Sequence, residues 1–129
     1  MYNRHVIVDL TDLTEALARL ALEGDDCLEI EAKTFSEYSR SALGPTLSAF
    51  ANLPRGGTIL LGVSEDLVSV VGVQDPHDLQ QTLVSQARQG FSTEIAVDTH
   101  AIAIEGKTVI AANVQEAPVN NKPCQWKET

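Results

Sequence analysis

The residues best suited to chemistry lie in one short stretch of alternating charge. Glu29, Glu31 and Lys33 occupy alternate positions, and Asp25 and Asp26 lie just upstream. Alternate residues of a strand share one face. Two carboxylates and a lysine arranged in this way suit a metal-dependent nuclease, where the acids hold Mg²⁺ and the lysine stabilises the attacking water or the developing charge. A solvated strand face of alternating charge accounts for the same residues, and we favour that interpretation.

A second candidate is the pair Gly56-Gly57, which follows Arg55 and separates a predicted helix from an apolar run. Glycine at such a place stops the helix and allows close backbone packing. Alternatively, the free backbone N–H groups and Arg55 would form a small nest for a phosphate. The sequence leaves both interpretations open.

Other motifs predict structural roles and no catalytic or nucleotide-binding site. The end of a phosphate-binding loop is suggested by residues 106–108 (Gly-Lys-Thr), but the Walker pattern requires glycine where Ala101 stands. A strand is expected after them instead of a helix, so we predict a hairpin turn. The histidines His5, His77 and His100 are isolated and complete no catalytic triad.

The overall charge opposes one class of function. The 129 residues include 9 Lys plus Arg against 18 Asp plus Glu, a net charge of −9. Binding to phosphates depends on cations that release counterions, so this field repels nucleic acid. Residues 41–64 nevertheless contain no acid and only Arg55, which leaves room for a local neutral or basic surface. Cys27 and Cys124 are far apart, so neither a disulfide framework nor a zinc site is expected. No apolar run approaches the roughly 18–20 residues that span a bilayer, and we expect a cytoplasmic protein.

Periodicity and turn residues predict the elements that position these groups. We expect a helix of about 12 residues from Asp12 to Gly24, a second within residues 41–53 with Pro45 in the first turn, and a third with Asp75 as its N-cap and Gly90 at its end. Strands are expected at 28–33, 58–63, 68–73, 95–104 and 109–114, the second and third as a hairpin and the fourth with a bulge near Thr99 and His100. This order predicts a single α+β domain over residues 1–129, with a mixed sheet of five or six strands and helices packed on it.

The order of several motifs is more specific than any one of them. It resembles the Schlafen/AlbA-like DNA-binding domain family over roughly residues 25–115, and residues 49–63 are the most specific part. The motifs are Glu31-Ala32-Lys33, then residues 47–52 (L-S-A-F-A-N), then residues 56–63 (G-G-T-I-L-L-G-V), then residues 71–73 (V-G-V).

The resemblance implies an α+β domain at the N-terminus of bacterial or archaeal transcriptional regulators, often followed by a winged-helix or helicase-related region. The chain would then be the N-terminal fragment of a longer protein. In Schlafen relatives a similar core cleaves RNA with three acids, which by position would be Asp26, Glu31 and either Glu65 or Asp66. Ser64 stands where the family often has aspartate, which weakens the nuclease interpretation.

These observations lead us to expect a non-catalytic regulatory domain, without cofactor, that binds DNA or RNA. Its contacts would centre on Lys33, Arg40, Arg55, Gly56 and Gly57. One alternative is a protein-interaction or dimerisation module that uses exposed strand edges, and a homodimer is expected in either case. Another alternative is a Mg²⁺-dependent nuclease.

Overall fold

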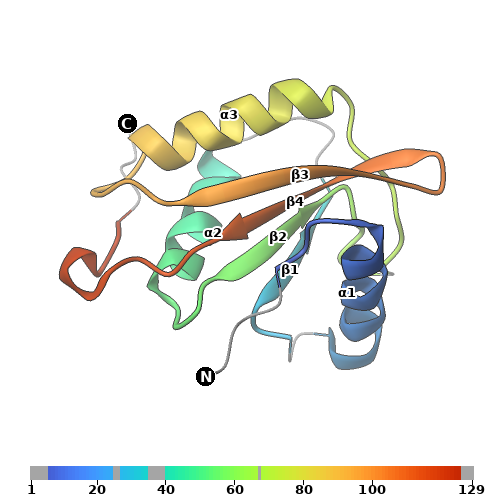
Figure 1. Ribbon diagram of the computed structural model, residues 1–129, viewed down its shortest axis with the longest axis horizontal. Coiled ribbons are helices and arrows are strands. Elements are labelled where there is room, and N and C mark those ends of the chain that lie inside the picture. Colours follow the sequence, from blue (N-terminus) through green and yellow to red (C-terminus); the bar gives the residue numbers. More distant parts are fainter. Residues whose placement is uncertain (1–5, 25–26, 35–39, 67, 126–129) are drawn as a thin grey trace.

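A mixed sheet with helices on both faces forms the structure, a computed structural model that describes residues 6–24, 27–34, 40–66 and 68–125 (Figure 1). Within these residues the strand order is β1-β2-β4-β3, with β1 parallel to β2 and the other neighbours antiparallel. The elements are α1 (Leu10–Glu23), β1 (Ile30–Lys33), α2 (Arg40–Asn52), β2 (Gly57–Leu61), α3 (Pro76–Gln89), β3 (Val97–Ile104), β4 (Lys107–Val114) and a 3-10 turn (Val119–Asn121).

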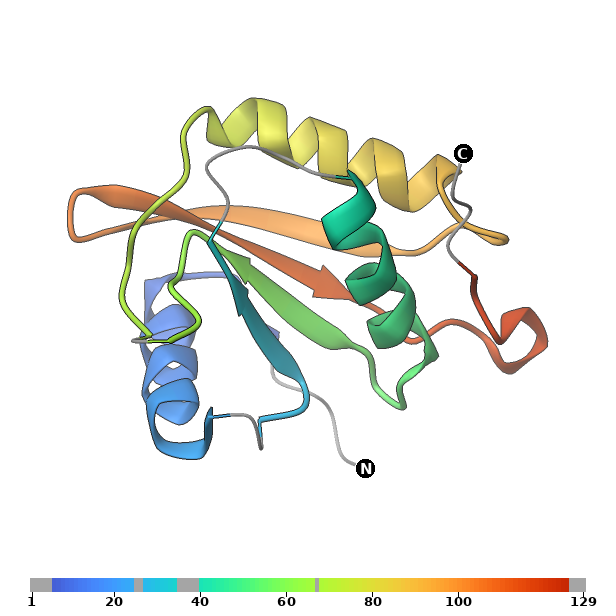
Figure 2. The same ribbon diagram turned by 180° about the vertical axis from the view of Figure 1, so that it is seen from behind.

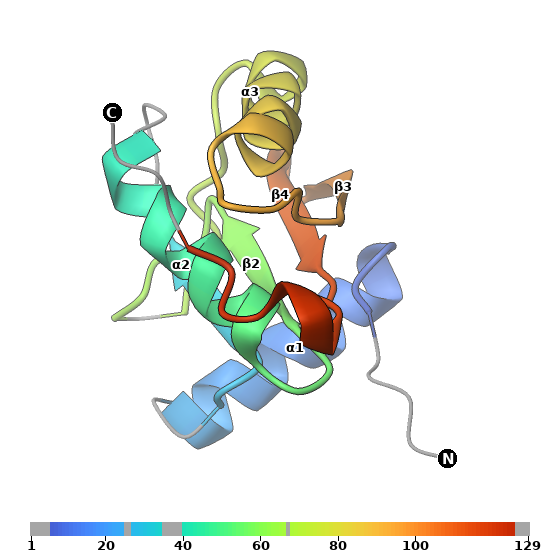
Figure 3. The ribbon, with the colours of Figure 1, turned by 90° about the vertical axis from the view of Figure 1, so that its left-hand side faces the viewer.

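Each face of the sheet has its own apolar core. The helix α1 packs on one face, and α2 and α3 pack together on the other, as the views from behind and along the sheet show (Figures 2 and 3). Along β2, Ile59 and Leu61 join the core under α2 and α3, whereas Leu60 joins the core under α1. All five residues of β2 are therefore buried, which confirms the prediction of a central strand covered on both sides.

The α+β class is confirmed, but the described sheet has four strands instead of five or six. The predicted strand at residues 68–73 does not form. Among its described residues, only Val70 pairs with a neighbouring segment, through an isolated antiparallel bridge to Val63. The backbone has positive φ at Val68 (50°) and Gly72 (77°), which prevents regular extension. The predicted hairpin is thus replaced by a loop that crosses closely over Gly62, whose carbonyl accepts hydrogen bonds from the N–H groups of residues 71 and 72 at 2.8 Å.

The strand β3 is regular, and the bulge expected near Thr99 and His100 is absent from its ladder, where all eight residues pair one to one with β4. Along β3 the apolar residues change from odd-numbered to even-numbered positions, and this change has a different cause. Val97 packs against the core under α3, whereas Ile102 packs against the core under α1. Different helices cover opposite faces of the two halves of this strand, so the apolar side changes without a bend.

Two predicted helix starts are displaced. Asp9 is the N-cap of α1: its carboxylate accepts from the N–H of Asp12 at 2.9 Å, while the carboxylate of Asp12 accepts from the N–H of Val8 at 3.0 Å. This reciprocal arrangement places Asp12 inside the first turn instead of before it. The helix α2 begins at Arg40, so Pro45 lies inside the helix and not in its first turn. None of the described helices is long and apolar enough to cross a membrane.

Candidate functional site

The parallel pairing of β1 with β2 brings Lys33 beside the loop that follows β2. The N–H groups of Gly62 and Val63 both donate to the carbonyl of Lys33, at 2.8 and 3.3 Å. Gly62 has a φ of 101°, a conformation that favours glycine, and a Cβ there would lie 3.0 Å from the carbonyl carbon of Gly72. The chain turns sharply at this point, and Glu65 Oε1 comes to 3.8 Å from Lys33 Nζ.

A cavity of about 500 Å³ lies beside this turn, between the end of α1, β1 and the loop after β2. Glu31, Glu65 and Asp66 all contribute to its lining. The Oε2 atom of Glu31 is shielded from solvent and has no hydrogen-bond partner within the described residues. The structure therefore brings together three of the four acids that the family resemblance implicated, although they lie up to 35 positions apart in the sequence. The fourth, Asp26, lies outside the described residues.

Lys33 is the counter-ion of this acidic pocket. Its Nζ atom lies 3.8 Å from Glu31 Oε2 and 3.8 Å from Glu65 Oε1, so it bridges the two carboxylates. Both contacts are too long for hydrogen bonds, and ion pairs as exposed as these contribute about 0–1 kcal/mol. Cys27 also lines the cavity, but burial raises the pKa of its thiol, which disfavours the reactive thiolate. Within the described residues, His, Cys, Asp and Glu form no cluster of three with metal-site geometry.

The nest predicted from the N–H groups of Gly56-Gly57, with Arg55 beside it, lies at the opposite end of β2. The N–H of Gly56 donates to the carbonyl of Leu53 at 3.0 Å, so it is not open to a phosphate. Arg55 and Gly56 have positive φ, 69° and 71°, and the N–H of Arg55 donates to Oε1 of Glu116, an anion from the chain itself, at 2.7 Å. The other oxygen of Glu116 pairs with Lys122 Nζ at 2.5 Å. The N–H of Arg55 and the ammonium of Lys122 hold the pKa of the Glu116 carboxyl below its usual value.

The two glycines at this end have packing roles. A Cβ on Gly56 would lie 2.0 Å from the carbonyl oxygen of Val114, and a Cβ on Gly57 would lie 2.4 Å from the ring of Phe50. The close-packing interpretation of Gly56-Gly57 is therefore satisfied by the geometry. Whether the same segment contacts a phosphate stays a prediction.

The predicted nucleic-acid contacts divide between the two ends of β2. Lys33 pairs with Leu61 at one end, whereas Arg55 precedes Gly57 at the other. From Gly57 to Leu61 the extended strand advances by four residue steps, roughly 13 Å at about 3.3 Å per residue. Arg40 is the first residue of α2, and its side chain lies outside the described part of the structure.

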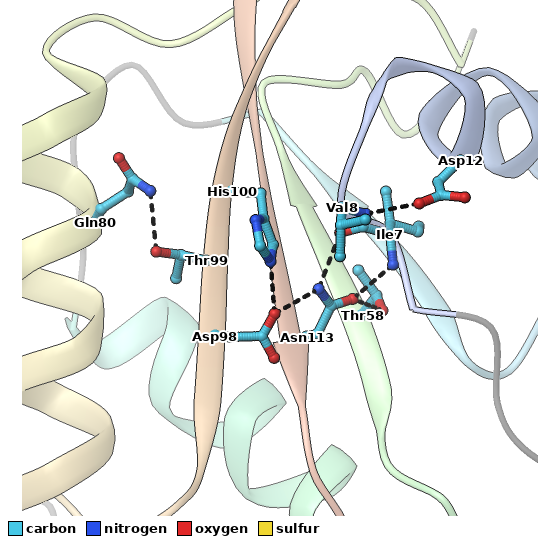
Figure 4. A network of polar contacts seen from close by, with 9 residues as sticks. All are labelled: Ile7, Val8, Asp12, Thr58, Gln80, Asp98, Thr99, His100 and Asn113. Carbon is cyan, nitrogen blue, oxygen red and sulfur yellow. Dashed lines mark hydrogen bonds and ion pairs between the residues drawn. The ribbon is translucent and has the colours of Figure 1, made fainter.

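A buried polar network that was not predicted from the sequence is centred on Asn113, which is 1% exposed (Figure 4). Its side-chain oxygen accepts from the N–H of Ile7 at 3.0 Å and from the hydroxyl of Thr58 at 2.7 Å. Its amide group donates to the carbonyl of Ile7 at 2.9 Å and to Asp98 at 3.1 Å, and Asp98 contacts the ring of His100 at 2.7 Å. This network attaches the N-terminal segment to the sheet. The one signal in the sequence is a lone asparagine in an apolar strand.

Asn52, in the most family-specific motif, has a similar structural role. Its side chain accepts from the N–H of Cys124 at 2.7 Å and donates to the carbonyl of Cys124 at 3.0 Å. The hydroxyl of Ser48 donates to the same carbonyl at 2.5 Å. The end of α2 thereby holds the segment that follows the 3-10 turn.

The fold and these motifs agree with a known family. The family model described as Schlafen, AlbA_2 matches residues 26–128. The chain belongs to this family. The matched region of the Schlafen AlbA_2 domain runs through every element from β1 to the 3-10 turn, whereas α1 precedes it.

Solved structures agree with this assignment. The N-terminal domain of a RecG-related protein from Nitrosomonas europaea, whose name relates it to an ATP-dependent DNA helicase, is 34% identical, with a TM-score of 0.73 over 90% of this chain and 80% of that one. A Corynebacterium diphtheriae protein shares the fold at 18% identity and a TM-score of 0.58; the match covers 91% of this chain and 23% of that protein. Among curated proteins, none matches significantly.

Proposed function

We propose that this Schlafen AlbA_2 domain binds nucleic acid without catalysing a reaction and acts as a regulatory domain. The observation that carries the proposal is the 34% identity, over 90% of the chain, to the N-terminal domain of a protein whose name relates it to a DNA helicase. Family membership supports the same conclusion.

Charge favours the Arg55 end of β2 over the Lys33 end as the contact surface. Arg55 is exposed, and among the described residues two cations, Arg55 and Lys122, lie beside the single carboxylate of Glu116. Around the pocket, the described residues include three acids, Glu31, Glu65 and Asp66, and Lys33 pairs with the first two, so the acids outnumber the cation. A phosphate backbone is therefore attracted to the first place and repelled from the second.

Binding is tested by fluorescence anisotropy with duplex and single-stranded DNA and RNA at about 50 mM salt, where electrostatic contacts are strongest. We expect weak binding, because each phosphate neutralised by a cation adds about 0.9 to the salt slope and few cations are available. Arg55→Ala should weaken binding and reduce that slope by about one. Arg19→Gln removes the same charge on α1, where Arg19 pairs with Glu23 and Glu29, and should have no such effect. Absence of binding to every probe would refute the proposal.

A metal-dependent nuclease is the second candidate, favoured by the pocket that Glu31, Glu65 and Asp66 share. Carboxylates that line one pocket are the ligands Mg²⁺ prefers; bound there, Mg²⁺ would take the place of Lys33 beside Glu31 and Glu65 and would supply an activated water molecule. Against this role, Lys33 already pairs with both Glu31 and Glu65, and within the described residues the acids form no cluster with metal-site geometry. We therefore expect no cleavage by this domain.

The nuclease is tested by incubating structured RNA and single-stranded DNA with Mg²⁺ or Mn²⁺. Glu31→Gln removes the pocket carboxylate, and Glu15→Gln makes the same change on the exposed side of α1 as a control. Metal-dependent cleavage that is lost only in Glu31→Gln would replace the non-catalytic proposal.

A further inference from the structure

The free edge of β3 is long and regular. In the strand order β1-β2-β4-β3, the strands β1 and β3 form the two edges. The strand β1 has four residues, including the charged Glu31 and Lys33, as is usual for a protected edge. The strand β3 has eight residues in continuous register, with neither proline, lysine nor bulge in its ladder, and Asp98 is its only acid. An edge of this kind is a template for another strand.

The hairpin geometry decides which backbone groups lie on that edge. Glu105 and Gly106 form the turn, so Ile104 and Lys107 are a hydrogen-bonded pair, and the even-numbered residues of β3 bond to β4. The N–H and C=O groups of the odd-numbered residues point away from β4. These residues are Val97, Thr99, Ala101 and Ala103. Among the described residues, no backbone hydrogen bond reaches these outward groups.

The centre of this edge carries polar groups that a second copy would complement. A groove of about 470 Å³ runs between α3 and β3, where Gln80 Nε2 donates to Thr99 Oγ1 at 3.0 Å. Asp98 and His100 flank Thr99, and the Asp98 carboxylate lies 2.7 Å from the His100 ring. In two antiparallel copies of β3 centred on Thr99, each Asp98 would lie opposite the His100 of the other copy.

We propose that a second copy of this chain pairs antiparallel along β3, with the two-fold axis at Thr99. This register joins outward groups to outward groups and places Asp98 of each copy opposite His100 of the other. The two sheets become one sheet of eight strands, and the two α3 helices lie antiparallel above it. The proposal commits to a surface for the expected homodimer and does not depend on nucleic-acid binding.

The mass in solution tests the pairing. Light scattering at about 5 and about 500 µM should show a shift from monomer to dimer. Ala101→Pro removes an outward N–H and should raise the dimer Kd about 10- to 100-fold, because one hydrogen bond is lost on each copy. Proline is tolerated at an outward position of an edge strand. Ala101→Ser keeps the N–H and should dimerise as the wild type does. A monomeric wild type at both concentrations would overturn the proposal.

A cysteine at the axis tests the register directly. Residues in a hydrogen-bonded antiparallel pair have Cα atoms about 5.5 Å apart, within the range that a disulfide spans. Thr99→Cys should therefore form a covalent dimer on mild oxidation, whereas Glu105→Cys, in the turn, should not. The two native cysteines are buried and give little background. Equal crosslinking of both variants, or crosslinking of neither, would refute the Thr99 axis.

Discussion

The two ends of β2 each hold an ion from the chain itself, but they hold it with different strength. At the Arg55 end, the Glu116 carboxylate is bound by contacts of 2.7 and 2.5 Å. At the other end, Lys33 lies 3.8 Å from both Glu31 and Glu65, beyond hydrogen-bond distance. The acidic end therefore holds its counter-ion loosely, and an external cation competes there more easily than an external anion competes at Arg55.

The largest expected effect on stability concerns the Arg55 end of β2. Gly56→Ala introduces a Cβ that would lie 2.0 Å from the Val114 carbonyl oxygen, at a φ of 71°. Overpacking and the left-handed conformation together should cost about 4 kcal/mol of unfolding free energy. Gly106→Ala is a matched control, because its φ is 72° and a Cβ there has nothing within 4 Å. That control should lose about 1 kcal/mol. Urea denaturation measures both, and equal losses would contradict the packing role of Gly56.

The buried pair of Thr58 on β2 and Asn113 on β4 provides a reference for the two ends of β2. Asn113→Ala removes the oxygen that accepts from the Thr58 hydroxyl, and it removes the hydrogen bonds that the Asn113 side chain makes to the N–H and C=O of Ile7. Buried polar groups without partners should cost about 3 kcal/mol. Urea denaturation measures the loss, and hydrogen exchange should show faster exchange at Ile7. Slow exchange at Ile7 in the variant would show that the segment is held by other contacts.

The stability of the Lys33 end of β2 should respond to a divalent cation once Lys33 is removed. Lys33→Met removes the counter-ion, so Glu31 and Glu65 are left with mutual repulsion that Mg²⁺ relieves. At a Mg²⁺ concentration about five times its Kd, the variant should gain about 1 kcal/mol of stability. Thermal melts with and without Mg²⁺ measure this gain. Lys107→Met, on β4, is the charge-matched control, and an equal Mg²⁺ response in both variants would rule out a response specific to the pocket.

The smallest expected effect is a pH dependence of stability that originates at the Arg55 end of β2. Because the folded protein lowers the pKa of Glu116, this carboxylate stabilises the fold above its usual pKa. That contribution is lost as the pH falls through the lowered pKa. Glu116→Gln should therefore flatten the acid limb of the stability curve, whereas Glu105→Gln should leave it unchanged. Urea midpoints across the acid range measure the slope, and parallel curves for wild type and Glu116→Gln would contradict the assignment.

The sequence predicted the elements whose signals are local. The apolar run of β2 indicated a strand buried on both faces, and residues 105 and 106 indicated the β3–β4 turn. The third helix has Asp75 as its N-cap and Gly90 as its C-cap, as predicted, although Asp75 makes no side-chain cap hydrogen bond. The failures were also local in origin. The apolar residues near Val70 resemble a strand, but positive φ values on both sides interrupt it.

The sequence by itself determined the helix and strand periods, the family motifs and the acidic balance, because these depend on residues a few positions apart. Only the tertiary structure decided what each charged group meets. Arg55 and Glu116 are 61 positions apart, and Asn113 and Ile7 are 106 apart. Such contacts depend on how the strands are ordered and where each returning segment lies. That is a property of the packed sheet, because local periodicity specifies an element but does not choose its neighbour.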